Sequence, residues 1–369
     1  MQAQNLRHRL DSLTAAPLFE TSQLGMMVWD LTDDALLFER NARQAMRPAS
    51  TLKLLTAITA LDYLGGDYKL STSLYCQGAV EEHTLCGDLI LVGGMDPLFD
   101  SVGLSGFVDS LRHMGVDTLR GRIVVDRSFK DTLSWGEGWC WDDNNPVLSP
   151  LLLNRKDSLA EQFIAMLDDA DIFFADVVLT SGRVSDTDCL VSRCEHGIDE
   201  LLVPMLKDSD NLYAECLLYQ IAAHTGTLFA SASQAHELEK QLLSRLGLDV
   251  NNYRLADGSG LSLYNYLSAE IVTKLLRYAW QNKSIRDHLL PALPVAGKDG
   301  TLANRMKRTA AAGNVRAKTG TLFGISTRAG YLTTAKGHTL CFCIFNQGVM
   351  KQSDGRAFHD KVCSALCKP

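Results

Sequence analysis

Three short polar strings, each present once, constrain this chain more than any other feature of its sequence. They are Ser50-Thr51-Leu52-Lys53, Ser209-Asp210-Asn211 and Lys318-Thr319-Gly320, in that order. A lone S-x-x-K is expected about once by chance in a chain of this length, but the ordered set of three is not. Side chains that act together must lie in contact. Because the strings are far apart in the sequence, they predict a large fold in which distant elements converge.

Length and composition narrow the class of protein. The chain has 369 residues, of which 46% are hydrophobic and 21% charged, as in an ordinary globular protein. This length predicts two domains or one large α/β unit. The net charge of −7 counts against a nucleic-acid partner, since phosphate contacts need clustered Lys and Arg.

The sequence predicts no transmembrane segment, because no stretch approaches the ~20 apolar residues that a membrane span needs. Residues 1–5 lack the basic and apolar regions of a signal peptide. If the protein is exported, we expect the targeting segment to be absent from this sequence.

Hydrophobic periodicity predicts an α/β protein with a change of pattern in its middle. Residues 24–30 and 35–39 form a strand-turn-strand signal, so the chain is expected to open with a hairpin. Apolar residues at helical spacing then run from Thr51 to Gly65, which places Ser50 at the start of a buried helix. From about 67 to 200 short β-type runs alternate with helices, as in a separate α/β unit. Helices are predicted for most of 209–290, strands for 315–345 and a closing helix for 354–366.

The pair Ser50 and Lys53 has the chemistry of a nucleophile and its base. A serine hydroxyl is a weak nucleophile at neutral pH and needs a neighbouring base. Lys53, three residues along the helix, lies on the same face. An ammonium deprotonates only if burial or nearby positive charge lowers its pKa, and we expect Lys318 to supply that charge. A helix-start serine with an exposed lysine is the ordinary alternative for S-x-x-K alone.

The second string offers two polar side chains at alternate positions. If the stretch is extended, Ser209 and Asn211 point into one cleft, with Ser209 relaying a proton and Asn211 fixing Lys53 or a substrate amide. A turn or helix cap, with Asp208 or Ser209 as the capping residue, is the usual role of such a string.

The third string is predicted to form a strand that borders the same cleft. Lys318 and Gly320 would share one face, and Gly320 leaves room for a substrate backbone. Thr319 and Thr321 offer hydroxyls to a carboxylate. The backbone N–H groups of Ser50 and Thr321 are the natural donors for an oxyanion hole. An exposed strand lysine is the alternative interpretation of Lys318.

Cysteine and histidine patterns argue against a metal site or a histidine-based triad. The ten cysteines show no C-x-x-C, and none of the nine histidines is next to a motif. We therefore expect no metal and no cofactor. Two disulfides are plausible in an oxidising compartment, Cys76–Cys86 around a turn and Cys189–Cys194.

The surrounding sequence resembles one family. The motif set S-x-x-K, S-x-N and K-T-G is that of penicillin-binding proteins and serine β-lactamases. The chain resembles, over most of its length, the class C low-molecular-mass penicillin-binding proteins, the D-alanyl-D-alanine carboxypeptidase/endopeptidase family. The strings that carry the resemblance are Gly87-Asp88-Leu89-Ile90-Leu91-Val92-Gly93-Gly94, Lys207-Asp208-Ser209-Asp210-Asn211-Leu212, Asp257-Gly258-Ser259-Gly260-Leu261-Ser262, Leu293-Pro294-Val295-Ala296-Gly297-Lys298-Asp299-Gly300 and Val315-Arg316-Ala317-Lys318-Thr319-Gly320-Thr321-Leu322.

The resemblance implies a β-lactamase/transpeptidase-like domain, an antiparallel sheet with helices plus a helical subdomain, interrupted by a smaller α/β insert. Residues 1–66 and 201–369 would form the discontinuous catalytic domain, and 67–200 the insert. It also implies a periplasmic or cell-surface location. Larger relatives carry a further nested domain, so the insert is expected to be trimmed. Many relatives have Arg where this chain has Leu263.

By motif match the resemblance implies a role for each residue. Asp143, in Trp141-Asp142-Asp143, stands where the family has an acidic residue facing the substrate's amino-bearing side chain. The remaining roles are Ser50 as nucleophile, Lys53 as base, Ser209 and Asn211 as relay and positioner, and Lys318 and Thr319 as the carboxylate clamp, with Gly320 and Thr321 bordering the substrate.

These features predict a serine D-Ala-D-Ala carboxypeptidase, and also a DD-endopeptidase, acting on peptidoglycan stem peptides and acylated by β-lactam antibiotics. A serine β-lactamase shares the motifs but must release the drug quickly. A non-catalytic penicillin-binding sensor or scaffold would not need complete motifs, so their completeness here counts against that alternative.

Overall fold

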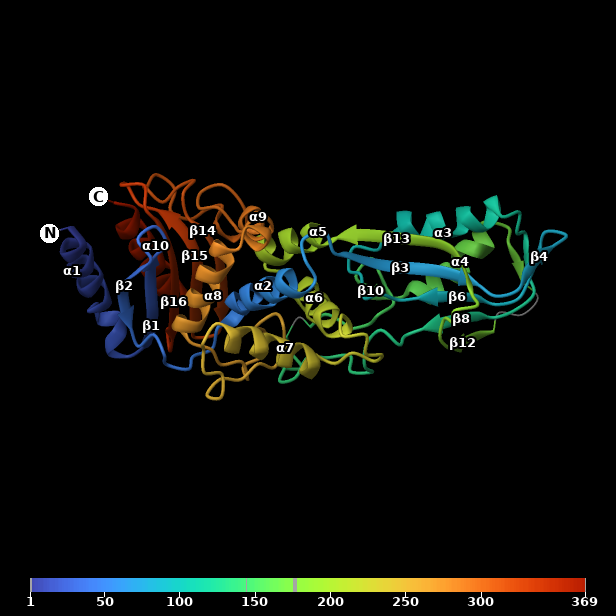
Figure 1. Ribbon diagram of the computed structural model, residues 1–369, viewed down its shortest axis with the longest axis horizontal. Coiled ribbons are helices and arrows are strands. Elements are labelled where there is room, and N and C mark those ends of the chain that lie inside the picture. Colours follow the sequence, from blue (N-terminus) through green and yellow to red (C-terminus); the bar gives the residue numbers. More distant parts are fainter. Residues whose placement is uncertain (1, 144, 175–177, 369) are drawn as a thin grey trace.

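Both termini lie at one end of an elongated molecule, and the middle of the chain forms the other end (Figure 1). The computed structural model describes residues 2–143, 145–174 and 178–368. Helices and sheets are mixed throughout, so the predicted α/β class is confirmed. Within the described part of the chain, no helix combines the length and apolarity needed to cross a membrane.

A five-stranded antiparallel sheet joins the two ends of the chain. Its order is β14-β15-β16-β1-β2. Its strands are β1 (Gln23–Asp30), β2 (Ala35–Arg40), β14 (Arg316–Leu322), β15 (Ile325–Thr333) and β16 (Thr339–Gln347). Strand β1 pairs with β16 from Gln23 opposite Gln347 to Asp30 opposite Leu340. The chain starts as the partner of its own last strand, which makes this unit discontinuous in sequence.

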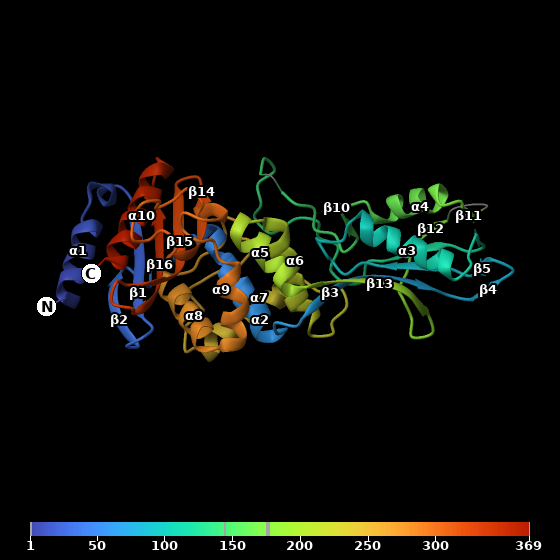
Figure 2. The ribbon, with the colours of Figure 1, turned by 90° about the horizontal axis from the view of Figure 1, so that it is seen from above.

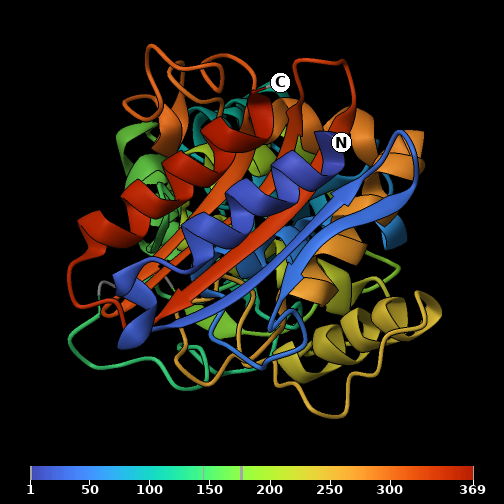
Figure 3. The same cartoon turned by 90° about the vertical axis from the view of Figure 1, so that its left-hand side faces the viewer.

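Helices cover both faces of this sheet. On the outer face α1 (Gln2–Thr14) and α10 (Gln352–Cys367) lie side by side across the strands (Figure 3). The predicted β1–β2 hairpin and the closing helix are confirmed, but the chain opens with α1, not with the hairpin. Leu6, Leu10 and Leu13 recur at helical spacing in α1 and pack into the core beneath α10. The short 3-10 turn Pro17–Glu20 links α1 to the sheet.

The other face of the sheet borders a helical region (Figure 2). Helix α8 packs against β1 and β16, and a single hydrophobic core joins α8 to the helices around it. These helices are α2 (Lys53–Tyr63), α5 (Ile198–Val203), α6 (Asn211–Ala223), α7 (Ala232–Arg245), α8 (Ala269–Gln281) and α9 (Lys283–Ala292). Helix α2 is buried on every side from Lys53 to Leu61 and ends before Gly65 at φ +84°, as the sequence predicted.

The middle of the chain builds two further sheets. The larger has the order β12-β8-β6-β3-β13, and the smaller has the order β11-β7-β5-β4. Their strands are β3 (Lys69–Cys76), β4 (Ala79–Glu81), β5 (Thr84–Cys86), β6 (Leu89–Val92), β7 (Thr118–Leu119), β8 (Ile123–Asp126), β11 (Phe173–Phe174), β12 (Leu179–Ser181) and β13 (Cys189–Gly197), with the separate pair β9 (Leu152–Leu153) and β10 (Lys156–Asp157). Helices α3 (Ser101–His113) and α4 (Leu159–Asp169) pack on one side and share a core with these strands. The buried members of that core all lie between Leu74 and Ile172. The predicted boundaries at 66/67 and 200/201 stay a prediction.

None of the ten cysteines forms a disulfide, so the two expected bridges are wrong for this structure. Cys189 and Cys194 lie five residues apart along β13, which is too far for a disulfide on an extended strand. Cys76 stands opposite Cys189 in the β3–β13 register, whereas Cys86 belongs to the smaller sheet. Strand pairing, and not closeness in sequence, decides which cysteines are neighbours.

Candidate active site

The first string folds into the tight turn that leads into α2. Ala49 has φ +46°, Ala49–Leu52 form one turn of 3-10 helix, and Lys53 is the first residue of α2. The Nζ atom of Lys53 lies 3.0 Å from the Oγ atom of Ser50, a hydrogen-bond distance. Lys53 is 0% exposed, so the alternative of an exposed lysine is wrong.

Two other oxygens hold the Lys53 amine. The Oδ1 atom of Asn211 and the carbonyl oxygen of Ser259 each lie 2.8 Å from Nζ. An ammonium has three N–H donors, and Ser50, Asn211 and Ser259 accept one each. On losing a proton, the amine can keep its bonds to Asn211 and Ser259 and direct its lone pair at Ser50.

Burial makes that proton loss accessible near neutral pH. It lowers the pKa of Lys53 to about 8, while the carboxylates of Asp257, Glu215 and Asp210 act in the opposite direction. Of the two causes that the sequence analysis named, burial is the one that lowers this pKa, and the charge interaction between Lys53 and Lys318 acts on Lys318. Burial and the charge of Lys53 hold the pKa of Lys318 well below its usual range.

The second string is a turn, which is one of the two conformations that the sequence left open, and not an extended stretch. A π-helical turn over Pro204–Asp208 ends at Ser209, which has a left-handed backbone with φ +64°. Asp210 caps α6 by accepting from the N–H groups of Leu212 and Tyr213, so the expected cap at Asp208 or Ser209 is wrong. The turn still directs both predicted side chains to the lysines, Asn211 to Lys53 and Ser209 to Lys318.

Lys318 in β14 connects the second string to the third. Its Nζ atom donates to the Oγ atom of Ser209 at 2.8 Å and to the carbonyl oxygen of Thr319 at 2.6 Å. The side chain is 0% exposed, which excludes an exposed strand lysine. Two sets of hydrogen bonds therefore join the three strings. Lys53 binds Ser50 and Asn211, Lys318 binds Ser209, and the second string contributes to both sets.

Gly320 allows β14 to pass close to the Ser50 turn. A Cβ atom at this position would lie 2.2 Å from the Oγ1 atom of Thr327 and 2.9 Å from the backbone nitrogen of Ser50. Both distances are shorter than any ordinary contact of a side-chain carbon. Glycine is therefore required at this position because the chain's own turn packs against it, and not only because a substrate backbone needs space.

The outer edge of β14 is available beside the serine. Strand β14 is terminal in its sheet, and the Ala317 N–H points away from β15 to the carbonyl of Pro294. Backbone groups of alternate residues share a direction in an antiparallel edge strand, so the Thr321 N–H also points outward. Thr319 donates its hydroxyl hydrogen to Thr301 at 2.8 Å, and Thr321 is exposed. An extended peptide could pair with this edge.

The sequence analysis gave no role to the buried groups behind Lys53. Ser259 lies in the turn Asp257–Ser262, which is fastened by the carboxylates of Asp257 and Glu215. Burial and the charge of Asp257 raise the pKa of Glu215. The string Asp257-Gly258-Ser259-Gly260 has the composition of a tight turn, but only the fold shows that its carbonyl faces Lys53.

Asp143 lies in the tryptophan-rich loop, residues 135–143, where its contacts are local. Its Oδ2 atom accepts from the backbone N–H of Cys140 at 2.9 Å. The loop itself reaches the motif region, because Trp139 donates its indole N–H to Asp257 at 2.9 Å. The structure brings Ser50, Lys53, Ser209, Asn211 and Lys318 together with β14; no hydrogen bond joins Asp143 to them among the described residues.

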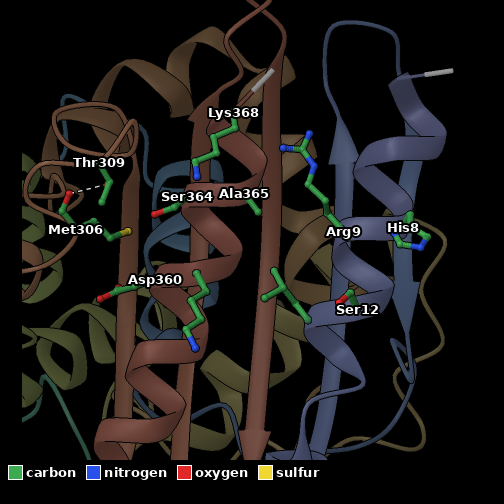
Figure 4. Close-up of a pocket in the computed structure, with 11 residues that line it drawn as sticks. His8, Arg9, Ser12, Met306, Thr309, Asp360, Ser364, Ala365 and Lys368 are labelled. Atoms are coloured by element: carbon green, nitrogen blue, oxygen red, sulfur yellow. Dashed lines mark hydrogen bonds between the residues drawn. The ribbon is translucent and has the colours of Figure 1, made fainter.

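Two other features lie away from the motifs. Asp30, Asp33 and His338 are, in the described chain, the one cluster with metal-ligand spacing. Asp30 lies 2.8 Å from His338 and raises its pKa, so the carboxylate and the imidazole already bind each other. A cavity of about 660 Å³ opens between α1 and α10 (Figure 4). Its lining comes from α1, α10 and the loop that carries Met306 and Thr309, and it includes no residue of the three strings.

Comparison with known proteins gives a consistent result. A family model described as D-Ala-D-Ala carboxypeptidase 3 (S13) matches residues 6–152 and 152–367. The D-alanyl-D-alanine carboxypeptidase of Actinomadura sp. (strain R39) is 27% identical over 93% of this chain and 81% of its own. The D-alanyl-D-alanine carboxypeptidase DacB of Haemophilus influenzae is 25% identical over 89% of this chain and 86% of its own.

Solved structures agree on the fold. The crystal structure of penicillin binding protein 4 (dacB) from Haemophilus influenzae has a TM-score of 0.89 at 22% identity, covering 98% of this chain and 99% of that chain. The TLA-3 extended-spectrum β-lactamase has a TM-score of 0.52 at 14% identity over 99% of this chain and 98% of its own. These confirm the predicted β-lactamase/transpeptidase-like fold.

The family model matches nearly the whole chain, and the matched residues include all three strings and the region between them. The resemblance to the class C low-molecular-mass penicillin-binding proteins is thereby confirmed, and this chain belongs to the D-Ala-D-Ala carboxypeptidase 3 (S13) family.

Proposed function

We propose that this protein is a serine D-Ala-D-Ala carboxypeptidase that trims peptidoglycan stem peptides through an acyl-enzyme on Ser50. One observation carries the proposal. Ser50 lies 3.0 Å from a fully buried lysine amine whose pKa burial lowers to about 8. A base poised close to neutral pH is what a serine nucleophile needs.

In the proposed acylation, the neutral Lys53 amine takes the hydroxyl proton of Ser50 while its own N–H groups stay on Asn211 and Ser259. The serine oxygen attacks the carbonyl carbon of the penultimate D-Ala. Negative charge develops on the carbonyl oxygen, and the N–H groups of Ser50 and Thr321 stabilise it. Our assignment of Thr321 is supported by its outward-facing backbone at the edge of β14.

The scissile C–N bond then breaks, and the leaving D-Ala nitrogen needs a proton. That proton is the one that Lys53 accepted from Ser50, and its transfer returns Lys53 to the neutral form; Ser209, hydrogen-bonded to Lys318 at 2.8 Å, is the proposed relay. The hydroxyls of Thr319 and Thr321 and the Lys318 amine are placed to bind the terminal carboxylate. Hydrolysis of the Ser50 ester by water, with Lys53 again as base, completes the cycle and releases the shortened peptide.

A DD-endopeptidase activity is part of the same proposal. Cleaving a crosslink requires space for a longer group on the leaving side, and the half-buried Ser209 and the exposed Thr321 border an open edge of the site. The fold is shared with the peptidoglycan endopeptidase Bd3459 of Bdellovibrio bacteriovorus, at a TM-score of 0.58 and 16% identity over 88% of this chain and 86% of that chain.

β-Lactams are proposed covalent inhibitors, because their strained amide acylates a serine that attacks D-Ala-D-Ala. The penicillin binding protein 4 of Haemophilus influenzae has been solved in complex with a β-lactam. A substrate in the cell wall also implies a periplasmic or cell-surface location for this protein.

We propose that Asp143 binds the amino-bearing side chain of the substrate. Its position in the loop that Trp139 attaches to Asp257 supports this role. An Asp143→Asn variant is expected to lose preference for stem peptides with a free amino group, with little change toward benzylpenicillin. An unchanged peptide preference would exclude the assignment.

Intact-mass spectrometry after brief exposure to benzylpenicillin tests the central proposal. We expect one adduct that persists for hours, maps to Ser50 and is missing in Ser50→Ala, together with D-Ala release from a D-Ala-D-Ala peptide. Rapid appearance of hydrolysed drug would identify a β-lactamase. If the wild type neither forms an adduct nor releases D-Ala, the result would favour the alternative of a non-catalytic sensor or scaffold.

A further inference from the structure

The backbone oxygen that holds Lys53 belongs to an unusually well fixed peptide group. The carbonyl of Ser259 accepts from Lys53 at 2.8 Å, and the N–H of the same peptide group, that of Gly260, donates to Asp257 Oδ1 at 2.8 Å. Hydrogen bonds at both ends of one amide polarise each other and fix its orientation. The lysine and Asp257 therefore act on one rigid unit.

Asp257 keeps the rest of this turn in place. It is 1% exposed and also accepts from the N–H of Ser262 at 2.7 Å and from Nδ2 of Asn265 at 2.7 Å. From the other side Glu215 accepts the N–H of Ser259 at 2.8 Å. A buried carboxylate is stable only while such donors surround it, so each donor to Asp257 contributes to the geometry of the turn.

One of these donors comes from a distant part of the chain. Trp139, in the tryptophan-rich loop, donates its indole N–H to Oδ2 of Asp257 at 2.9 Å. The loop is seated closely on the turn, since a Cβ atom at Gly138 would lie 2.6 Å from the Oγ atom of Ser262 and 2.5 Å from the ring of Tyr264. The loop is thus connected to the proposed base Lys53 through the Asp257 carboxylate and the amide between Ser259 and Gly260.

We infer that Trp139 and Asp257 are a positioning pair through which the middle region of the chain holds the Ser259 carbonyl, and with it Lys53, in reacting geometry. This inference rests on the proposed function of Ser50 and Lys53. Neither side chain touches the reacting atoms. Trp139 donates a hydrogen bond to Asp257, and Asp257 orients the amide between Ser259 and Gly260. The carbonyl of that amide in turn holds the Lys53 amine.

Trp139→Phe is the decisive variant, since it keeps an aromatic ring and removes only the donor. One buried hydrogen bond corresponds to about a fivefold change in rate. We expect the rate constant for acylation of Ser50 by benzylpenicillin to fall by about that factor. Trp135→Phe, in the same loop with a half-exposed ring, is the matched control and should leave the rate unchanged.

A double-mutant cycle separates positioning from packing. Asp257→Asn removes the negative charge and one of the two acceptor oxygens, so adding Trp139→Phe to it should cause less loss than Trp139→Phe causes in the wild type. Asp257 also raises the pKa of Lys53, and its removal should move the midpoint of the acylation pH profile to lower pH. Equal rates for Trp139→Phe and Trp135→Phe, or additive effects of Trp139→Phe and Asp257→Asn, would overturn the inference.

The design keeps this inference separate from the proposed function. If wild-type protein forms no Ser50 adduct, the proposed function fails. If wild type is acylated but Trp139→Phe matches its control, only the positioning role fails. The melting curve shows whether Asp257→Asn folds. If it does not, the acylation rates of Trp139→Phe and Trp135→Phe still test the positioning role, provided that the two variants have the same melting temperature.

Discussion

Acylation of Ser50 is expected to depend on pH in a way that the burial of Lys53 fixes. Only the neutral amine can accept the serine proton, so the rate follows the fraction of Lys53 that is deprotonated. That fraction rises with pH, and the rate must therefore rise with it. The charged or titratable groups that face the amine are Glu215, Asp257, Asp210 and Lys318.

The size of the effect follows from a Lys53 pKa of about 8. The neutral fraction is then about one-tenth at pH 7 and about one-half at pH 8. The rate constant should increase about fivefold from pH 7 to pH 8 and less than about twofold from pH 8 to pH 10. A lysine with its ordinary pKa of 10.5 would instead give roughly a tenfold rise per pH unit up to pH 9.5.

The assay is stopped-flow or quenched mass spectrometry of the benzylpenicillin adduct at saturating and subsaturating drug. Ser50→Ala at each pH corrects for hydrolysis of the drug by base, and Lys53→Met should remove the pH-dependent rate. A rate that does not vary between pH 7 and 9, or one that climbs tenfold per unit through pH 9, would refute the assignment of Lys53 as a base activated by burial.

Three further outcomes are expected. Gly320→Ala should displace the Ser50 turn and lower both the melting temperature and the acylation rate, whereas Gly106→Ala in α3, where a new Cβ meets nothing within 4 Å, should be neutral or stabilising; equal effects would contradict the close approach at Gly320. Asp100→Ala removes the N-cap of α3 and should lower stability by about 1 kcal/mol in denaturant titration without changing acylation. Cys76 and Cys189 should join first under a mild disulfide oxidant, seen as a loss of two hydrogens by peptide mapping, while a Cys76–Cys86 product would contradict the strand register.

Much of the candidate site could be predicted from local sequence. The three strings identified Ser50, Lys53, Ser209, Asn211 and Lys318, and the structure brings these five residues into one site. Periodicity also located helix α2, because apolar residues on every turn between Pro48 and Gly65 can be buried only as a helix. The helix α1 was missed, since its single apolar stripe is short and is stabilised by packing on α10.

Backbone detail at the second string depended on its surroundings. Ser209 takes a left-handed conformation that a serine rarely adopts. Tertiary contacts hold it there, including the bond from Lys318 to its hydroxyl. A local pattern could name the residues but could not decide between an extended stretch and a turn.

The sequence by itself determined which side chains form the site and which family the chain resembles, because both depend on the type and order of residues in short motifs. The fold decided what those side chains can do. The low pKa of Lys53 comes from complete burial, and its orientation comes from a peptide group fixed by Asp257, Glu215 and Trp139. Burial and long-range hydrogen bonds are properties of the folded environment, created by residues that are distant in the chain, and no local pattern contains them.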